Sequence, residues 1–431
     1  MSANIKALAG SAPQLDRPVS PARIFWAAWL GWMLDGFDSG LYIYILTPAV
    51  TELLAHSHRA AATAPVALYG GYFFSVFMLG WACSMLWGWL ADRIGRVKVM
   101  CLTIIVYSVF TALCGLAPSL LLFGVFRFLA GFGIGGEWAA GVSLLHESVP
   151  ERVRVRYAGW LHTATPTGQI LAACASLLYP ILGWRGLFLL GILPALLTIY
   201  LRRSIPEPEK WQRRTQAERP STRDLFRSPL ARSTWPAALM LSCAIFGLWS
   251  TSFWAPTFVV TKVVAEGGAR EAAQRLASFA GLAGAIGTLA ACLLAPWIVA
   301  RFGSRRSTGT FFFSGALLVA VFTYGYAAKV PHGLLLFMAL LPVLGFFTNG
   351  VFALYSIWLP EMFPSIHRAS GAGFAFSLGR ILGAAGPTAV GALVGSTGSY
   401  PTAILLVSLI YVIGVPFTMW SPETAHRPLP Q

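Results

Sequence analysis

Two carboxylates lie inside an apolar segment that is long enough to cross a membrane. Asp35 and Asp38 fall between Ile24 and Val50, a stretch that covers a hydrocarbon core of ~30 Å at ~1.5 Å per helical residue. Asp35 lies ~16 Å in from Ile24, near the middle of the bilayer. An acid at that depth is costly unless it lines a polar path or carries protons. We predict proton coupling through Asp35 and Asp38, which share one helical stripe with Tyr42.

Two arginines occupy similar depths in other apolar segments. Arg127 lies ~14 Å into the fourth segment, and Arg380 lies ~16 Å into the eleventh. A guanidinium is a forked donor that matches a carboxylate, so both arginines are predicted to bind an anionic substrate. For Arg127, an internal pair with Asp35 or Asp38 is an open alternative. For Arg380, the apolar segments of the second half hold no acid, which favours contact with substrate.

Uncharged polar side chains supply further candidates for substrate contact. Gln169 in the fifth segment and Asn349 in the tenth join Tyr42 as predicted substrate-binding residues. Helix packing, or a place in an interfacial belt, is the competing explanation for each of them. The sequence contains no cluster of metal ligands, no nucleotide-binding loop and no nucleophile constellation. We therefore predict no metal, no cofactor and no enzymatic activity.

The composition is that of a polytopic helical membrane protein. Mean hydropathy is +0.67, and 56% of the residues are hydrophobic while only 11% are charged. An ordinary soluble domain carries about 25% charged residues, so that class is excluded. Apolar runs recur along the whole chain and predict twelve transmembrane helices, at 24–50, 66–90, 97–117, 119–145, 157–180, 184–201, 235–260, 276–300, 307–328, 334–358, 369–394 and 400–420.

The basic charge follows the membrane topology. The formal net charge is +15, and most Lys and Arg residues fall in the segments that share a side with the N-terminus. This asymmetry is the positive-inside pattern, and it predicts that both termini are cytoplasmic. We attribute the excess charge to topology and anionic lipid rather than to nucleic acid.

The chain reads as two similar halves. The segment 300–306, after the eighth span, repeats the Arg, the Gly and the final basic residue of the segment Gly88–Lys98. A proline-rich hydrophilic stretch lies midway. We predict a cytoplasmic tail at 1–23, six-helix bundles at 24–201 and 235–420, a cytoplasmic linker at 202–234, and a second tail at 421–431.

Several of these segments resemble the signatures of the major facilitator superfamily. They are the loop Gly88–Lys98, the Arg-containing stretch Arg127–Gly135, the elements Glu147–Arg154 and Glu361–Arg368, and the tail Pro422–Thr424. The resemblance covers essentially the whole chain. It implies an all-α membrane fold of twelve helices in two six-helix pseudo-repeats, with the substrate between the halves.

Four other segments resemble one branch of that superfamily. Leu34–Asp38, Gly135–Trp138, Gly183–Phe188 and Ile205–Trp211 are similar to the sialate/proton symporter family, which includes sialic acid and lactate–pyruvate permeases. The aromatic-acid/proton symporters share the DGxD element. The segment Pro166–Gln169 lacks the GP and GG elements of drug/proton antiporters.

The resemblance also implies a cytoplasmic gate. In the superfamily, charged residues at these motif positions tie the inner ends of the helices together when the cavity faces outward. Ordinary loop charge is the competing explanation. The predicted gate residues are Asp92, Arg93, Arg96, Glu147, Arg154, Arg301, Glu361 and Arg368.

The expected function is import of a small organic anion with protons by alternating access. Sialic acid, or a monocarboxylate such as lactate or pyruvate, is the substrate implied by the resemblance. The alternatives are an aromatic-acid/proton symporter and a polyspecific proton-driven exporter. We expect a multi-pass protein of the bacterial inner membrane that functions as a monomer.

Overall fold

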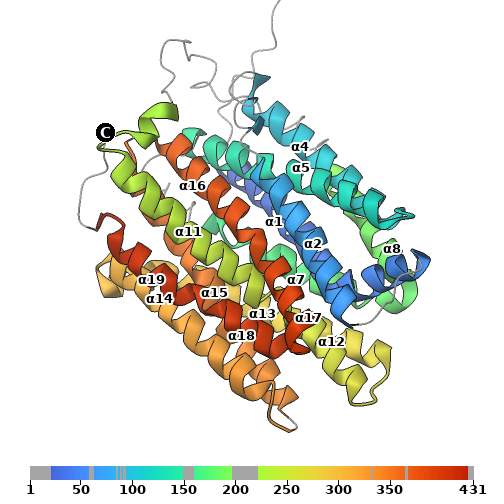
Figure 1. Cartoon of the computed structure of the whole chain (residues 1–431). Coiled ribbons are helices and arrows are strands. Elements are labelled where there is room, and N and C mark those ends of the chain that lie inside the picture. Colours follow the sequence, from blue (N-terminus) through green and yellow to red (C-terminus); the bar gives the residue numbers. More distant parts are fainter. Residues whose placement is uncertain are drawn as a thin grey trace, which may run out of the picture.

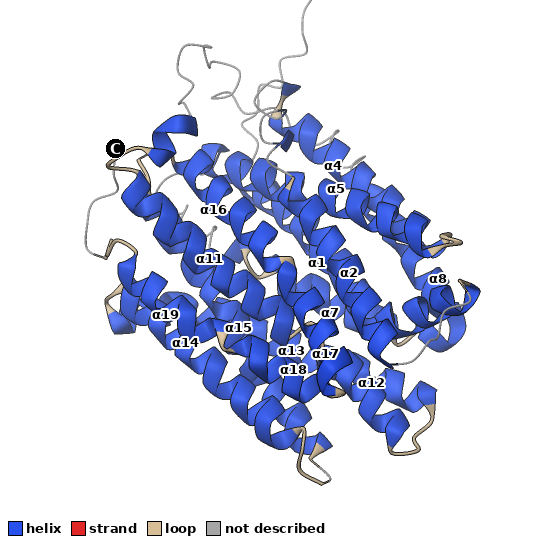
Figure 2. Cartoon of the chain, in the orientation of Figure 1, coloured by secondary structure: helices blue, strands red, loops and turns tan. Residues whose placement is uncertain are grey.

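The computed structural model describes residues 21–57, 63–83, 86–87, 90, 94–148, 160–196, 222–331, 333–364 and 367–425. Every regular element in these ranges is helical (Figure 2). Helices suit a chain of this composition because each backbone N–H and C=O finds its partner within the same segment, away from water.

The first half consists of α1 and α2, followed by α4, α5, α7 and α8. Helix α1 packs against α7, and α5 packs against both α2 and α4. Helix α8 is followed by a short 3-10 turn. The bounds are Pro21–His56 for α1, Thr63–Ala82 for α2, Arg96–Gly115 for α4, Leu120–Ser148 for α5, Ala164–Ser176 for α7, Tyr179–Leu189 for α8 and Leu190–Ile192 for η1.

The second half runs from a 3-10 turn to α19, and several of its spans consist of two helices in succession. Helix α13 packs on α15, and α11 packs on α16 and α19. The bounds are Thr222–Phe226 for η3, Ala231–Thr251 for α11, Ala255–Ala265 for α12, Arg270–Phe302 for α13, Arg305–Ala320 for α14, Val321–Ala327 for the π-helical η4, Leu334–Met362 for α15, Arg368–Gly383 for α16, Ala385–Thr397 for α17, Tyr400–Ser408 for α18 and Ile410–Trp420 for α19.

Nine stretches of the described residues are helical, long and apolar enough to span a membrane. They correspond to nine of the twelve segments expected from the sequence. The other three expected spans contain α1, α5 and α7. The break expected near 182–184 is visible as a kink at Gly183, whose φ of 61° lies in the left-handed region that glycine tolerates.

The halves meet mainly through α2 with α17 and α7 with α13, and α2 also packs on α16. Figure 1 shows the two groups of roughly parallel helices, with the C-terminal part of the chain at one end of the bundle. We call the end where α19 finishes the tail end, and the opposite end, where α17 finishes, the far end.

At the far end, the segment after Gly183 holds the first half together. The Trp184 indole N–H donates to Glu52 at 2.6 Å, and Arg185 pairs with the same carboxylate at 3.0 Å. The Arg185 guanidinium also donates to the carbonyl oxygens of Gly115 and Ala117, at 3.0 and 3.1 Å. These bonds join the end of α1, the part of α8 after its kink and the turn between α4 and α5.

Close backbone approach between α2 and α5 depends on glycine. A Cβ on Gly80 would lie 2.1 Å from the Phe128 carbonyl oxygen, and one on Gly131 would lie 2.0 Å from that of Phe77. Small residues at such crossings let helix backbones touch within a membrane. The approach holds Phe77 on α2 beside Arg127 on α5.

We predict that Gly80→Ala destabilises the first half, because a new methyl group would overlap backbone atoms that cannot rotate away. Overpacking of this kind costs about 1–3 kcal/mol. Thermal unfolding of the detergent-solubilised protein, followed by tryptophan fluorescence, should show a lower midpoint. Gly395→Ala is the matched control, since nothing lies within 4 Å of its Cβ position. Equal midpoints for the two variants would contradict the prediction.

Candidate functional site

The first acid–arginine pair lies inside the first half. Asp38 on α1 and Arg127 on α5 are both fully buried, and Arg127 is the cation that acts electrostatically on Asp38. Thr111 and Cys114 of α4 lie beside them. Of the two acids that the sequence left open as partners for Arg127, Asp38 is therefore the one on which the Arg127 charge acts.

Hydrogen bonding around this pair is incomplete within the part of the chain that the structure describes. Neither carboxylate oxygen of Asp38 and none of the guanidinium nitrogens of Arg127 has a hydrogen-bond partner there. The Arg127 guanidinium carbon lies instead 4.4 Å from the ring centre of Tyr42 and 4.2 Å from that of Phe77. Aromatic faces attract a cation, but they leave its N–H groups free for water or a ligand.

The second pair joins the two halves. Arg380 on α16 is only 6% exposed, and the charge that acts on it is Asp35 of α1. Its guanidinium carbon lies 4.5 Å from the ring centre of Trp81 on α2 and 5.4 Å from that of Phe376 on its own helix. Arg380 thus finds in the first half the acid that its own half does not provide.

The two acids on one stripe of α1 therefore serve different arginines. Asp38 faces Arg127 within its own half, whereas Asp35 faces Arg380 across the interface. The third member of the stripe, Tyr42, is also fully buried. Its hydroxyl donates to the carbonyl oxygen of Gly70 at 3.0 Å, so its polar atom is already used within the first half.

A small cavity of about 60 Å³ lies between the halves. Two of the predicted substrate-binding residues, Gln169 and Asn349, line it, while Tyr42 and the two arginines do not. Its wall contains no charged side chain. The lining consists of Ile43, Tyr44, Gln169, Leu248, Trp249, Ser252, Phe253, Ala255, Pro256, Ala280, Gly281, Gly284, Ala285, Thr288, Leu341, Leu344, Gly345 and Asn349.

The cavity wall is largely apolar and contains aromatic rings from the second half. Trp249 and Phe253 pack against Phe74 of α2, with ring centres 4.7 and 4.3 Å apart. Ser252 shares a hydrogen bond of 3.1 Å with Thr348, which also accepts one of 3.3 Å from the Asn349 amide. A volume of this size admits a few waters.

Polar contacts toward the far end hold the halves together. The Ser75 hydroxyl donates to the Ala384 carbonyl oxygen and shares a 2.7 Å bond with Thr388. Ser176 donates to Ser278 at 2.7 Å. These bonds link α2 with the α16–α17 junction and α7 with α13.

His162 contacts the second half on the other side of the cavity. Its Nδ1 lies 3.3 Å from the Ser356 hydroxyl, and its carbonyl oxygen accepts a long contact of 3.9 Å from the Cys292 thiol. Its ring meets the Trp32 ring edge-on, with centres 5.1 Å apart. His162 therefore joins α1, α13 and α15.

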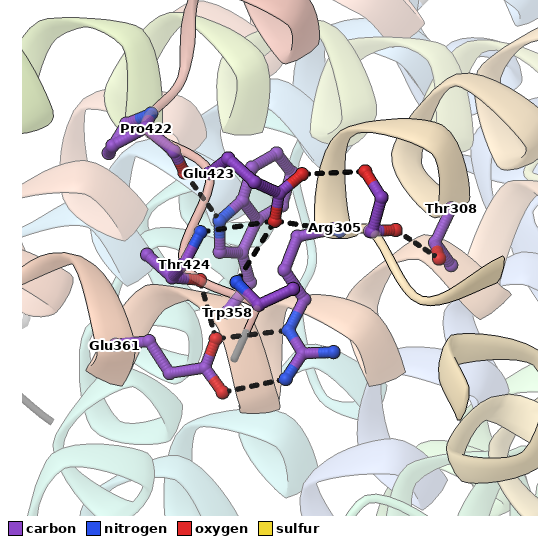
Figure 3. Close-up of polar contacts among 9 residues, drawn as sticks. Arg305, Thr308, Trp358, Glu361, Pro422, Glu423 and Thr424 are labelled. Atoms are coloured by element: carbon purple, nitrogen blue, oxygen red, sulfur yellow. Dashed lines mark hydrogen bonds and ion pairs between the residues drawn. The ribbon is translucent and has the colours of Figure 1, made fainter. Parts of the chain in front are cut away.

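A charged cluster at the tail end binds the C-terminal segment to the second half (Figure 3). The Arg305 guanidinium donates to both Glu361 oxygens, at 2.9 and 3.0 Å, and Thr424 donates to Glu361 at 2.6 Å. Glu423 accepts from the Ser304 hydroxyl at 2.6 Å and from the Arg305 backbone N–H at 3.0 Å. The cluster spans the α13–α14 turn, α15 and the tail.

The predicted gate residues divide into three groups. Glu361 lies in the tail-end cluster, but its partner is Arg305, and the Arg301 side chain is exposed. Arg96, Glu147 and Arg368 lie in helices, with their side chains outside the described set. Asp92, Arg93 and Arg154 lie outside the described residues altogether. The roles of all eight as a gate stay predictions.

Arg305 and Glu423 are site residues that the sequence reasoning missed. The tail Pro422–Thr424 and the segment 300–306 were recognised as motifs, but separately. A helix-capping pattern links them, because Ser304 is the N-cap of α14 and Glu423 accepts from the first backbone N–H groups of that helix.

We predict that Glu423→Gln loosens the tail. Burial raises the pKa of Glu423, but hydrogen bonds from Ser304 and from the backbone N–H groups of Ala425, Arg305 and Arg306 outweigh it and lower the pKa to about 2. The stabilisation is thus fully present above the ordinary value of 4.5 and is lost as the pH falls toward 2. The variant should melt lower than wild type by a constant margin between pH 5 and 8.

Glu266→Gln is the control for this measurement, because Glu266 is exposed and its pair with Lys262, four residues away at 3.6 Å, lies at the surface. A margin for Glu423→Gln that changes steadily between pH 5 and 8 would contradict the assigned pKa.

Comparison with known proteins shows similarity over nearly the whole chain. A family model described as Major Facilitator Superfamily matches residues 28–328. The niacin transporter NiaP of Acinetobacter baylyi is 28% identical, over 94% of this chain and 95% of its own length. The sialic acid transporter NanX of Escherichia coli is 27% identical, over 85% of each chain.

A solved structure shares the arrangement of the helices. The crystal structure of a D-xylose-proton symporter superimposes with a TM-score of 0.73, over 94% of this chain and 99% of that one, at 18% sequence identity.

Proposed function

The chain belongs to the Major Facilitator Superfamily, and from that membership we propose that it imports a small organic carboxylate together with protons. The fold is the twelve-helix, two-repeat architecture expected from the sequence. Members of the family are transporters, so no enzymatic activity is proposed.

The proposed cycle is a movement of the two halves against each other. The halves 24–201 and 235–420 would act as the moving bodies, and 202–234 as their connection. The contacts of Ser75 and Ser176 would be broken when the far end opens, and those of His162 when the tail end opens. With most Lys and Arg residues on the tail side, we propose cytoplasmic termini, a bacterial inner-membrane location and a monomeric unit.

The observation that carries the proposal is that each buried acid of α1 interacts electrostatically with a buried arginine, Asp38 with Arg127 in its own half and Asp35 with Arg380 in the other half. Neither charge of such a pair can remain alone at low dielectric. When a carboxylate substrate reaches Arg380, Asp35 loses its cation and is driven to take up a proton. Asp38, held beside Arg127, is the second carrier that we propose for protons. Arg127 would attract the anion from inside the first half.

The chemistry of the cavity bears on the class of substrate. Sialic acid and short monocarboxylates are the substrates implied by the sequence motifs. Sialic acid is also the substrate named for NanX. The wall around Gln169 and Asn349 is mainly apolar and aromatic, which suits a flat, weakly polar acid. Niacin, the substrate named for NiaP, is a pyridine carboxylic acid. An aromatic acid is therefore the second candidate.

Uptake into proteoliposomes separates these candidates. Labelled N-acetylneuraminate, lactate, nicotinate and benzoate would be offered with and without an inward proton gradient. We expect uphill accumulation of at least one acid, by about tenfold per pH unit for each coupled proton. A correctly inserted protein that accumulates none of the four contradicts the proposal. Accumulation driven only by an outward gradient favours the exporter.

Replacement of the acids tests the coupling. We expect Asp38→Asn to abolish accumulation against a gradient while exchange of labelled for unlabelled acid continues, because the amide cannot load a proton. Asp35→Asn should behave likewise and should also weaken binding, since Arg380 loses its resting partner. Glu266→Gln, an exposed far-end acid, is the control. If Asp38→Asn or Asp35→Asn still accumulates the acid fully against its gradient, the replaced aspartate is not part of the coupling mechanism.

A further inference from the structure

Two neighbouring rings of α2 connect the arginines of the two halves. Phe77 and Trp81 lie one helical turn apart, and their ring centres are 6.0 Å apart. Arg127 lies over the first ring, at 4.2 Å, and Arg380 lies over the second, at 4.5 Å. Helix α2 thus presents one aromatic face to each of the deeply buried cations.

Trp81 has a second feature that packing alone does not require. Its indole Nε1 is buried and has no hydrogen-bond partner among the described residues. A buried donor without an acceptor costs free energy, and native proteins avoid this. By contrast, Trp29 donates to Thr163, Trp87 to the Phe132 carbonyl and Trp358 to the Pro422 carbonyl.

The combination points to a ligand that only accepts hydrogen bonds. An indole N–H and a guanidinium are both donors without acceptor capacity, and an ionised carboxylate is an acceptor without donors. A neutral amide or a protonated acid can offer this pair its carbonyl oxygen, but it lacks the negative charge and the second equivalent acceptor oxygen of a carboxylate. The arrangement would therefore favour an anion over its neutral analogue of the same size.

We propose that Trp81 is a specificity-determining substrate-binding residue, whose Nε1–H donates to the substrate carboxylate while Arg380 binds that same group. This proposal deepens the proposed function and rests on it, because the ligand is the transported carboxylate. The ring face of Trp81 holds the guanidinium at the interface. The carboxylate replaces Asp35 at Arg380 and supplies the acceptor that the indole lacks. Substrate recognition is then shared by α2 of the first half and α16 of the second.

Two substitutions separate the functions of this side chain. Trp81→Phe keeps an aromatic face for Arg380 and removes the N–H donor, whereas Trp81→Leu removes both. Trp254→Phe is the matched control, because its indole Nε1 is also buried without a partner among the described residues. Trp254, however, packs on Phe253 and Tyr400 rather than on an arginine. Each variant would be reconstituted, and its folding checked by thermal unfolding.

The first readout is the kinetics of uptake for the acid that wild type accumulates among N-acetylneuraminate, lactate, nicotinate and benzoate, with its amide as a competitor. Trp81→Phe should raise KM by about tenfold or more, as expected for a lost hydrogen bond to a charged group, with kcat nearly unchanged. The amide, a poor competitor in wild type, should become relatively stronger. Trp254→Phe should leave both values at wild type.

A second readout follows the donor itself. In protein labelled with ¹⁵N-tryptophan, the indole resonance that disappears in Trp81→Phe belongs to Trp81. Saturating amounts of the transported acid should move that resonance downfield, while its amide should not.

The outcomes are distinguishable. If wild type transports an acid but Trp81→Phe keeps its KM and its preference for acid over amide, the inference is overturned while the proposed function stands. The inference is also overturned if the Trp81 indole resonance does not shift when the transported acid is added. If wild type transports none of the four acids, the proposed function fails first, and the role of Trp81 fails with it.

Discussion

The cost of burying charge is the constraint on which this structure depends. Two acids and two arginines lie deep in the bundle, and each of them needs an opposite charge or a polarisable neighbour. Within the first half, Asp38 and Arg127 meet this requirement together with the rings of Tyr42 and Phe77. Arg380 lies beside the Phe376 ring of its own half, but the acid that acts on it, Asp35, belongs to the other half. Its need for Asp35 and Trp81 makes the two halves electrostatically dependent on each other.

Much of the architecture follows from local sequence properties, because membrane spans are specified by apolar length alone. The expected superfamily and its fold are confirmed. The pairing of side chains is harder to predict from the sequence, since it depends on which faces of distant helices meet. The sequence shows that the apolar segments of the second half hold no acid for Arg380, but it does not show that the acid acting on Arg380 comes from α1, about 345 positions earlier in the chain. Gln169 and Asn349 were found because polar residues in apolar helices are rare.

The tail-end cluster is a second long-range contact that local sequence does not predict, in this case at a helix terminus. Glu361 was found through its motif, whereas Arg305 and Glu423 become recognisable only when the tail folds back onto the start of α14. Backbone N–H groups at a helix start have no partner within the helix, and a carboxylate from a distant segment can satisfy them. Sequence patterns describe caps supplied by neighbouring residues, so a cap supplied by residues more than a hundred positions away is not visible to them.

The helix breaks have a mechanical consequence. In the first half, α1, α2, α4 and α5 are continuous helices. Three spans of the second half each consist of two helices in succession, namely α11 with α12, α16 with α17, and α18 with α19. A divided span can bend at its junction with little loss of backbone hydrogen bonding, while a continuous helix resists bending. The junction at Ala384 lies one helical turn beyond Arg380, so bending there would reorient the far part of the span while the guanidinium stays in place on its aromatic support.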